Sequence, residues 1–360
     1  MTLRIDYPLV MSWLLILALG TVMVTSTGIA VDANLLPRQG VYLILALSVF
    51  AVVVMIPLSF WESAYGLCWF AAAILCLLVL IPGIGLEAKG AQRWILLGSF
   101  TLQPAEVAKF FLLVYLAGYL ARHDARVAEE TVALLKPMAM VAVICGLLLR
   151  QPDFGTAVLL MGSACALLFV AGARLRNYLF IVLVAGVGSL LLVYLEPYRM
   201  ARVWSFLDPW ADAEDGGYQL TQSLIAFGRG ETFGLGLGEG IQKLAYLPEA
   251  ETDFIYAVIA EELGLIGAVA VICLFTFMIV RMLRIGRLSL LADRRFAGYL
   301  VYGIALLLGL QALVSLGVNT GVLPTKGLTL PFVSYGGNSL IVCCAMLALV
   351  CRIWWEAEDG

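Results

Sequence analysis

The sequence predicts an all-α polytopic membrane protein with ten transmembrane helices and a large outward-facing loop between the seventh and eighth helices. Hydrophobic residues make up 62% of the 360 residues and charged residues only 13%, whereas soluble domains carry about 25% charged residues. Apolar stretches that approach the length of about 20 residues needed to cross a bilayer recur along the whole chain. Their backbones are expected to be helical, because hydrocarbon offers no partners for free N–H and C=O groups.

We expect these spans to form one domain that covers residues 1–360. The fifth span is predicted to be short, and Pro152 with Gly155 marks the break before the sixth. The first span does not resemble a cleaved signal peptide, because it lacks a small-residue cleavage site and is long enough to cross the membrane. The ten predicted spans are residues 9–31, 40–60, 63–85, 104–121, 137–150, 155–172, 178–195, 253–283, 296–318 and 335–353.

Orientation follows from the positions of Lys and Arg, which concentrate in short loops on the cytoplasmic side. The short basic connections are residues 122–136, 173–177 and 281–295. The loops expected to face outward are residues 86–103, 196–252 and 319–334. Both termini are therefore predicted to be cytoplasmic. The length and aromatic content of the 196–252 loop predict an ordered cap or interfacial helices rather than a flexible tether.

Several classes of function are excluded by composition and pattern. A net charge of −3 without a basic stripe argues against a nucleic-acid partner. The eight cysteines all lie in apolar runs and form no CxxC pair, so we expect buried thiols rather than disulfides or a metal site. The glycine-rich run at 234–240 lacks the Lys-Ser/Thr pair of a nucleotide-binding loop. His123 stands alone among charged residues, which argues against a zinc site or a catalytic histidine.

Ionisable residues inside spans are costly and are usually functional or paired. Glu106 and Lys109 are three residues apart near the outer start of the fourth span, so they share a helix face. They form either an ion pair that stabilises the bundle or the floor of a polar cavity at the outer leaflet. Asp153, in the break between the fifth and sixth spans, lies at the same membrane face and could join that cavity. Glu261 and Glu262, about two turns into the eighth span, are predicted to be structural hydrogen-bond hubs.

The outward loops carry cations that would suit a phosphate-bearing lipid if several of them converged beside acids. Taken singly, each is more simply explained by contact with water or lipid headgroups. These cations are Lys89, Arg93 (beside Trp94), Arg199, Arg202, Arg229, Lys243 and Lys326.

Asp253 lies where a polar stretch, residues 242–253, meets the strongly apolar eighth span. A carboxylate at such a junction can reach water, a lipid headgroup and a desolvated cavity, and partial loss of bulk solvent makes it a stronger base. It could then take a proton from a sugar hydroxyl. The alternative is a helix N-cap acid favoured by the helix dipole, with Thr252 as a competing cap. Position alone leaves the two interpretations equal.

Long stretches of the chain match one family of membrane proteins. The matches include residues 22–26 (VMVTS), 89–95 (KGAQRWI), 103–106 (QPAE), 151–153 (QPD), 217–223 (GYQLTQS), 247–249 (LPE) and 334–337 (SYGG). On these residues the chain resembles the SEDS family of shape, elongation, division and sporulation proteins, which are polytopic peptidoglycan glycosyltransferases. Residues 226–230, 242–243, 246–250 and 323–327 are written as in the division-type members rather than the elongation-type members.

The resemblance implies roles for individual residues. Asp253 matches the essential acid of the family and is the expected general base, while Glu106, Lys109 and Asp153 match residues of a central polar cavity. The other predicted substrate contacts lie in or near the matching stretches, and Arg93 and Lys326 among them are expected near the pyrophosphate. These contacts are Arg93, Trp94, Gln219, Lys243, Glu249 and Lys326. The leaving pyrophosphate would be stabilised by Lys109, Arg93 or a divalent cation held among the acids.

The chain departs from the family pattern at two positions. Glu251 stands where the family usually has His, and Asn338 stands where it usually has Ser. Glu251 places a second acid two residues from Asp253, where it could strengthen that base or help to hold a divalent cation, Mg²⁺ or Mn²⁺. No other cofactor is expected, and a mechanism that requires an imidazole at position 251 is in doubt.

The function implied by the resemblance is polymerisation of lipid II into β-1,4 glycan strands during septal wall synthesis, by an inverting glycosyltransferase in the cytoplasmic (inner) membrane. Alternatives are a lipid II flippase or other lipid carrier, an elongation-type polymerase, and a non-enzymatic scaffold. Implied partners are lipid II and undecaprenyl-pyrophosphate-linked glycan, a class B penicillin-binding protein of the FtsI type, and the divisome proteins FtsQ, FtsL and FtsB. No nucleic-acid partner is expected.

Overall fold

The computed structural model describes residues 5–31, 35–88, 91–98, 100–325 and 327–359. In these ranges nine helices are long and apolar enough to cross a membrane, and a shorter apolar helix of 17 residues adds a tenth. The ten-helix membrane fold is therefore confirmed. The ten helices are α1 (Tyr7–Val31), α2 (Leu35–Met55), α3 (Leu58–Leu78), α4 (Pro104–Glu129), α5 (Thr131–Arg150), α6 (Phe154–Val170), α7 (Leu175–Tyr194), α10 (Ile255–Leu291), α11 (Arg295–Asn319) and α12 (Gly337–Asp359).

Two predicted spans differ from the structure. The fifth span is not short, because α5 contains 20 residues and carries Pro137 inside it. The eighth span continues to Leu291 and is broken at Gly264, where the backbone has φ 69° and ψ −168°. Helix α5 continues through Pro137 and ends before Pro152, as the predicted break requires, whereas the break in α10 at Gly264 was not predicted.

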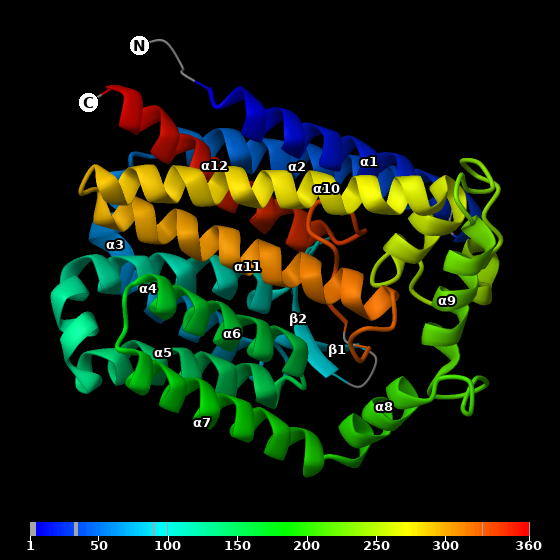
Figure 1. The fold of residues 1–360 in the computed structure, drawn as a ribbon, viewed down its shortest axis with the longest axis horizontal. Coiled ribbons are helices and arrows are strands. Elements are labelled where there is room, and N and C mark those ends of the chain that lie inside the picture. Colours follow the sequence, from blue (N-terminus) through cyan, green and yellow to red (C-terminus); the bar gives the residue numbers. More distant parts are fainter. Residues whose placement is uncertain (1–4, 32–34, 89–90, 99, 326, 360) are drawn as a thin grey trace.

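The helices run side by side, and both chain termini lie at the same end of the bundle (Figure 1). An even number of crossings requires this arrangement. Two further helices, α8 (Pro197–Leu207) and α9 (Tyr218–Gly230), lie at the opposite end, which we call the outer end. Together with a single π-helical turn at Gln242–Tyr246, they give order to the 196–252 loop and confirm that it is not a flexible tether.

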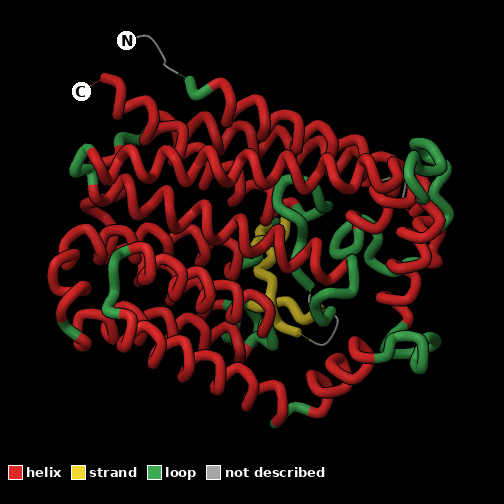
Figure 2. Tube along the Cα trace, viewed as in Figure 1, coloured by secondary structure: helices red, strands yellow, loops and turns green. Residues whose placement is uncertain are grey.

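A small antiparallel sheet lies in the outward loop between α3 and α4, and it was not predicted. Its strands are β1 (Gly85–Ala88), β2 (Ala91–Leu97) and β3 (Phe100–Leu102), hydrogen-bonded in the order β1-β2-β3. Figure 2 marks the strands in yellow, and Leu86, Leu96 and Phe100 are exposed, so the helices do not enclose the sheet. Gly98 adopts φ 63° after β2, a conformation that glycine accepts at little cost in a tight turn.

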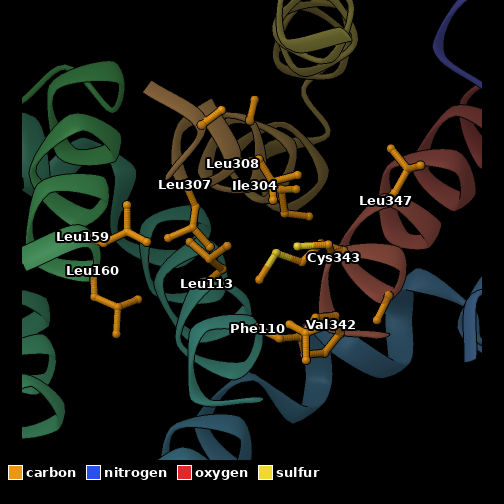
Figure 3. Packing of buried hydrophobic residues seen from close by; sticks show 14 of the residues in the cluster. Phe110, Leu113, Leu159, Leu160, Ile304, Leu307, Leu308, Val342, Cys343 and Leu347 are labelled. Atoms are coloured by element: carbon orange, nitrogen blue, oxygen red, sulfur yellow. The ribbon is translucent and has the colours of Figure 1, made fainter. Parts of the chain in front are cut away.

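Helix α4 lies at the centre of the bundle, since 83% of its most apolar 18-residue stretch is buried. Figure 3 shows side chains of α4, α6, α11 and α12 packed together, including Leu113, Leu160, Leu307 and Leu347. Lipid tails are as apolar as these side chains, so tight van der Waals packing rather than escape from water holds the helices together. Gly118 of α4 allows a close approach to α3, because a Cβ atom there would collide with the side chain of Tyr65.

The break in α10 is closed by the segment that follows α9. Backbone amides of Leu235 and Gly236 donate to the carbonyls of Glu261 and Glu262 at 3.0 Å each. On the other side of Gly264, the amides of the first two residues donate to carbonyls of the same segment. The segment that follows α9 therefore pairs with the backbone N–H and C=O groups that the break would leave unpaired inside the membrane.

Candidate active site

Asp253 lies half-buried in the turn that precedes α10, at the outer end of the bundle. Its backbone carbonyl accepts a 2.8 Å hydrogen bond from Nδ2 of Asn319, at the end of α11. Oδ1 of Asn319 accepts from the amide of Ala257 at 3.0 Å, so this buried side chain caps the first turn of α10. The N-cap position is Phe254. The interpretation of Asp253 or Thr252 as the N-cap is therefore wrong, because Asn319 from another helix accepts the hydrogen bond in the first turn of α10.

The turn before α10 is held against the segment 327–336, which leads into α12. Oγ of Ser334 donates to the carbonyl of Thr252 at 2.6 Å, and the amide of Tyr335 donates to the carbonyl of Glu251 at 2.8 Å. A Cβ atom placed on Gly327 would lie 3.3 Å from Oδ2 of Asp253. The carboxyl of Asp253 therefore faces the start of this segment at close range.

A buried ion pair lies behind the same segment. Nζ of Lys109 lies 2.8 Å from Oε2 of Glu106, and the two side chains are 1% and 8% exposed. Lys109 also donates to Oε1 of Gln311 at 3.1 Å, and Gln311 donates to the carbonyl of Thr329 at 2.9 Å. The predicted pairing of Glu106 with Lys109 is confirmed. Through Gln311 the pair is connected to the segment that contacts Asp253.

Asp153 caps α6, because its Oδ1 accepts from the amide of Thr156 at 3.3 Å. The side chain is buried. Two residues later, a Cβ atom on Gly155 would lie 3.5 Å from Leu328, the residue after Gly327. The first turn of α6, which Asp153 caps, and the carboxyl of Asp253 thus lie beside successive residues of the 327–336 segment, and a shared polar cavity stays a prediction.

Arg93 joins the sheet to the α5–α6 break. It projects from β2, its Nε donates to the carbonyl of Gln151 at 3.0 Å, and its Nη2 donates to the carbonyl of Pro152. Trp94 is half-buried and pairs with Leu86 across the sheet. The guanidinium of Arg93 therefore binds the carbonyls of the two residues that precede Asp153. Its contact with a pyrophosphate stays a prediction.

A second buried charge cluster surrounds the break in α10. Nζ of Lys243 lies 2.6 Å from Oε1 of Glu262 and donates to Oγ of Ser26 at 2.8 Å. Glu261 pairs with Arg229 at 3.1 Å and accepts two backbone amides. Both glutamates are fully buried, which confirms their prediction as hydrogen-bond hubs. Lys243 belongs to this cluster, and its substrate contact stays a prediction.

The remaining predicted contacts lie around the same end of the bundle. Gln219 is half-buried in the first turn of α9. Glu249 is half-buried in the turn before Asp253, where its Oε2 accepts from Oγ1 of Thr252 at 3.0 Å. Lys326 and the candidate cation Lys89 lie outside the described residues.

Glu251 and Asp253 would supply only part of the ligand set of a divalent cation, with waters or substrate phosphates as the rest. Mg²⁺ and Mn²⁺ prefer about six oxygen ligands, of which one or two are usually carboxylates and several are waters or substrate phosphates. Across the ranges that the structure describes, no group of three or more His, Cys, Asp or Glu is arranged to hold a metal. Glu251 and Asp253 alone do not form a protein cage, so no chemical step is assigned to a bound metal.

Sequence reasoning missed Asn319, Gln311, Thr329 and Ser334. Gln311 is a buried polar residue inside an apolar span, and that signal could have identified it. Asn319 ends its span and looks like an ordinary boundary residue. Its role depends on Asp253, which is 66 positions away in the sequence.

Comparisons with known proteins bear on the whole chain. The family model for FtsW, RodA and SpoVE, described as "Cell cycle protein", matches residues 7–358. A probable peptidoglycan glycosyltransferase FtsW of Pseudomonas fluorescens (strain SBW25) is 46% identical over 361 residues, covering 98% of this chain and 89% of that protein. The FtsW of Nitrosococcus halophilus (strain Nc4), also named a probable peptidoglycan glycosyltransferase, is 49% identical over 350 residues, covering 95% and 90%.

Solved structures agree with the sequence relatives. A chain of a peptidoglycan synthase complex, described for its structural coordination of polymerization and crosslinking, matches with a TM-score of 0.84 and 31% identity, covering 100% of both chains. The crystal structure of the rod shape determining protein RodA of Thermus thermophilus matches with a TM-score of 0.73 and 30% identity, covering 98% of this chain and 97% of that one. The higher identity to the FtsW proteins confirms the division-type resemblance. The chain therefore belongs to the SEDS family, the cell cycle proteins FtsW, RodA and SpoVE.

Proposed function

We propose that this protein is a peptidoglycan glycosyltransferase that polymerises lipid II into β-1,4 glycan strands at the outer face of the cytoplasmic membrane, for wall synthesis at the division septum. The observation that carries the proposal is the position of Asp253. Its backbone is fixed by Asn319 at 2.8 Å, and its carboxyl faces the segment that begins at Gly327. A half-buried acid at the membrane boundary meets a substrate whose sugar lies in water and whose tail lies in lipid.

The proposed reaction is a single displacement. Asp253 takes the proton from the C4 hydroxyl of the acceptor sugar, and that oxygen attacks the anomeric carbon of the donor. The bond from this carbon to the pyrophosphate oxygen breaks, and undecaprenyl pyrophosphate leaves with the bonding electrons. Attack opposite the leaving group converts the α-linked phosphate into a β-glycoside, so the enzyme inverts configuration. The donor arrives activated, and no nucleotide is needed.

The remaining groups position the substrate and stabilise the leaving group. Donors aimed at the developing charge usually make the largest catalytic contribution. Arg93 holds the α5–α6 break by two carbonyls and is the cation that borders Asp153. Lys109 contacts Glu106 and Gln311, and Gln311 donates to Thr329, so its proposed role is to hold the 327–336 segment in place. Lys326 remains a proposed pyrophosphate contact.

A partner protein is proposed as well. The solved complex that matches this chain couples polymerization to crosslinking. By analogy, we expect this chain to work with a class B penicillin-binding protein of the FtsI type, alongside FtsQ, FtsL and FtsB. Both termini are proposed to face the cytoplasm, and the 196–252 loop, which belongs to the same single domain, would face the partner's catalytic side of the membrane.

The test is polymerisation of lipid II by the purified protein in its complex, with and without the cognate transpeptidase. The Asp253→Asn variant should make glycan about 10²–10⁴-fold more slowly, whereas Asp215→Asn, which changes an exposed acid of the outer loop, should be as active as the unchanged protein. A lipid-translocation assay in liposomes separates the carrier alternative. Translocation without polymer in the complete complex would replace the enzyme by a carrier.

A further inference from the structure

Helix α8 has two chemically different faces. Met200, Val203, Trp204 and Leu207 recur at the i, i+3, i+4, i+7 spacing that places side chains on one face of a helix. Polar residues Arg199, Arg202 and Ser205 occupy the other side. In a water-soluble protein the apolar face of such a helix would turn toward the protein and the polar face toward solvent.

Two arginines of the polar face reach the rest of the protein, although Arg202 itself is exposed. Nη1 of Arg199 donates to the carbonyl of Leu192 at 2.8 Å, and its guanidinium lies 4.9 Å from the centre of the Phe154 ring. Nη1 of Arg202 donates to the carbonyl of Thr325 at 3.4 Å. The two arginines therefore make their contacts with the rest of the molecule from one side of the helix.

Trp204 and Leu207 of the apolar face are turned away from the protein, whereas Met200 and Val203 of the same face are half-buried. Trp204 and Leu207 are each 63% exposed, and within this fully described helix no residue is buried. Trp210, just beyond the helix, is 59% exposed. Exposed tryptophan beside arginine is the composition found at membrane interfaces, where the ring sits at the level of the headgroups.

The position of α8 identifies what covers this face. Only residues 195–196 separate it from α7. Just 11% of the most apolar 18-residue stretch of α7 is buried, and Leu183, Val187 and Leu190 are exposed along its length. These α7 side chains face lipid. Helix α8 begins where α7 ends and runs obliquely to it at the outer end of the bundle (Figure 1). The exposed face of α8 therefore continues the lipid-facing surface of α7.

We propose that α8 is an interfacial helix seated in the outer leaflet, with Trp204 and Leu207 among the headgroups and upper acyl chains. A second part of the proposal rests on the proposed function. Arg202 holds Thr325, two residues before Gly327, and Arg199 holds Phe154, the neighbour of Asp153. The position of α8 in the leaflet then sets the positions of the segments at Thr325 and at Phe154, which border the candidate active site.

The first experiment measures where Trp204 lies. The chain has eight tryptophans, so the emission of Trp204 is taken as the difference between the unchanged protein and Trp204→Phe in lipid nanodiscs. This emission should fall severalfold when the phosphatidylcholine is brominated high on its acyl chains, and aqueous iodide should quench it weakly. Strong quenching by iodide without an effect of the brominated lipid would overturn the proposal, and would leave water or a partner protein as the neighbour of this face.

The second experiment tests whether the position of α8 in the outer leaflet affects the candidate active site. Leu207→Asp puts a charge on the apolar face, and Ala211→Asp puts the same charge in the exposed turn beyond α8. Leu207→Asp should reduce quenching of Trp204 by the brominated lipid and lower the rate of glycan synthesis severalfold, while Ala211→Asp changes neither. Reduced quenching with an unchanged rate would overturn the coupling to the site. If the unchanged protein makes no glycan, the proposed function fails, but the quenching result still decides the lipid seat.

Discussion

The side-chain amide of Asn319 donates a 2.8 Å hydrogen bond to the backbone carbonyl of Asp253 and accepts one from Ala257, two residues into α10. One buried side chain thereby fixes both the proposed base and the first turn of the helix behind it. The carbonyl of Ser315 receives the second amide hydrogen of Asn319, which holds the side chain in one orientation. The position of the base is therefore set by α11.

Replacing Asn319 by Asp should disturb the base more than it disturbs binding. The carboxylate can still accept from Ala257 but cannot donate to Asp253, so the turn is free to shift. Misplacement of a catalytic group by about 1 Å can cost about 10²-fold in rate. We expect a loss of that order in kcat for lipid II polymerisation, with KM changed much less.

The matched control for this variant is Ser315→Ala on the same helix. The Ser315 hydroxyl is buried and makes no hydrogen bond with any part of the chain that the structure describes, so its removal should leave kcat nearly unchanged. Equal losses in both variants would show that Asn319 acts only through the packing of α11.

The effects of replacing Glu106 and Lys109 on the stability of the protein should be strongly coupled. Lys109→Met leaves a buried carboxylate without its partner, a change that typically costs about 3–5 kcal/mol. Thermal unfolding of the purified protein in nanodiscs should therefore show a large fall in melting temperature. The double variant Glu106→Leu, Lys109→Met removes both charges and should recover most of that stability. Additive losses in the double variant would contradict the pairing.

Gly264 should not tolerate a side chain. Its φ of 69° suits glycine, and a Cβ atom would collide with the amide nitrogen of Gly234 in the segment that closes the break. Gly264→Ala should lower the melting temperature, because the closing segment must move away and expose unpaired backbone groups to lipid. Gly228→Ala is the control, since outside the adjacent backbone of α9 no described atom lies within 4 Å of the added carbon, and α9 should be stabilised by about 0.5–1 kcal/mol.

Glu251 departs from the family pattern, and its replacement by His should be tolerated. The contact of this residue with the neighbouring segment is made by its backbone carbonyl, which accepts from Tyr335 at 2.8 Å. We therefore expect Glu251→His to polymerise lipid II at a rate close to that of the unchanged protein. A large loss in rate, or a new dependence on added Mg²⁺ or Mn²⁺, would show that the side chain takes part in the reaction.

Hydropathy predicted the ten spans because each needs only a local run of apolar residues, and the orientation expected from Lys and Arg stays a prediction. The sheet was not predicted, because the apolar end of β2 is too short to stand out from the neighbouring spans. Glu106 with Lys109 could be paired from spacing, since i and i+3 residues share a helix face. Contacts made across the fold, such as that of Asn319 with Asp253, carry no local signal.

Asn338 illustrates the same limit. The sequence shows it only as a departure from the usual serine, and its role follows from a distant partner. Its Nδ2 donates to the carbonyl of Thr101 in β3 at 2.7 Å, which joins the start of α12 to the unpredicted sheet. The departure is explained by the structure, because the longer amide side chain reaches an acceptor on another element.

The central claim is that Asp253 acts as the general base. It is tested most directly by single-turnover polymerisation of lipid II by the purified complex, comparing the unchanged protein with Asp253→Asn after both are shown to have the same melting temperature and to bind the same partner. Loss of a general base typically costs about 10²–10⁴-fold in rate. We expect a loss in that range with lipid II still bound. Glycan synthesis at the unchanged rate by the folded Asp253→Asn complex would contradict the account.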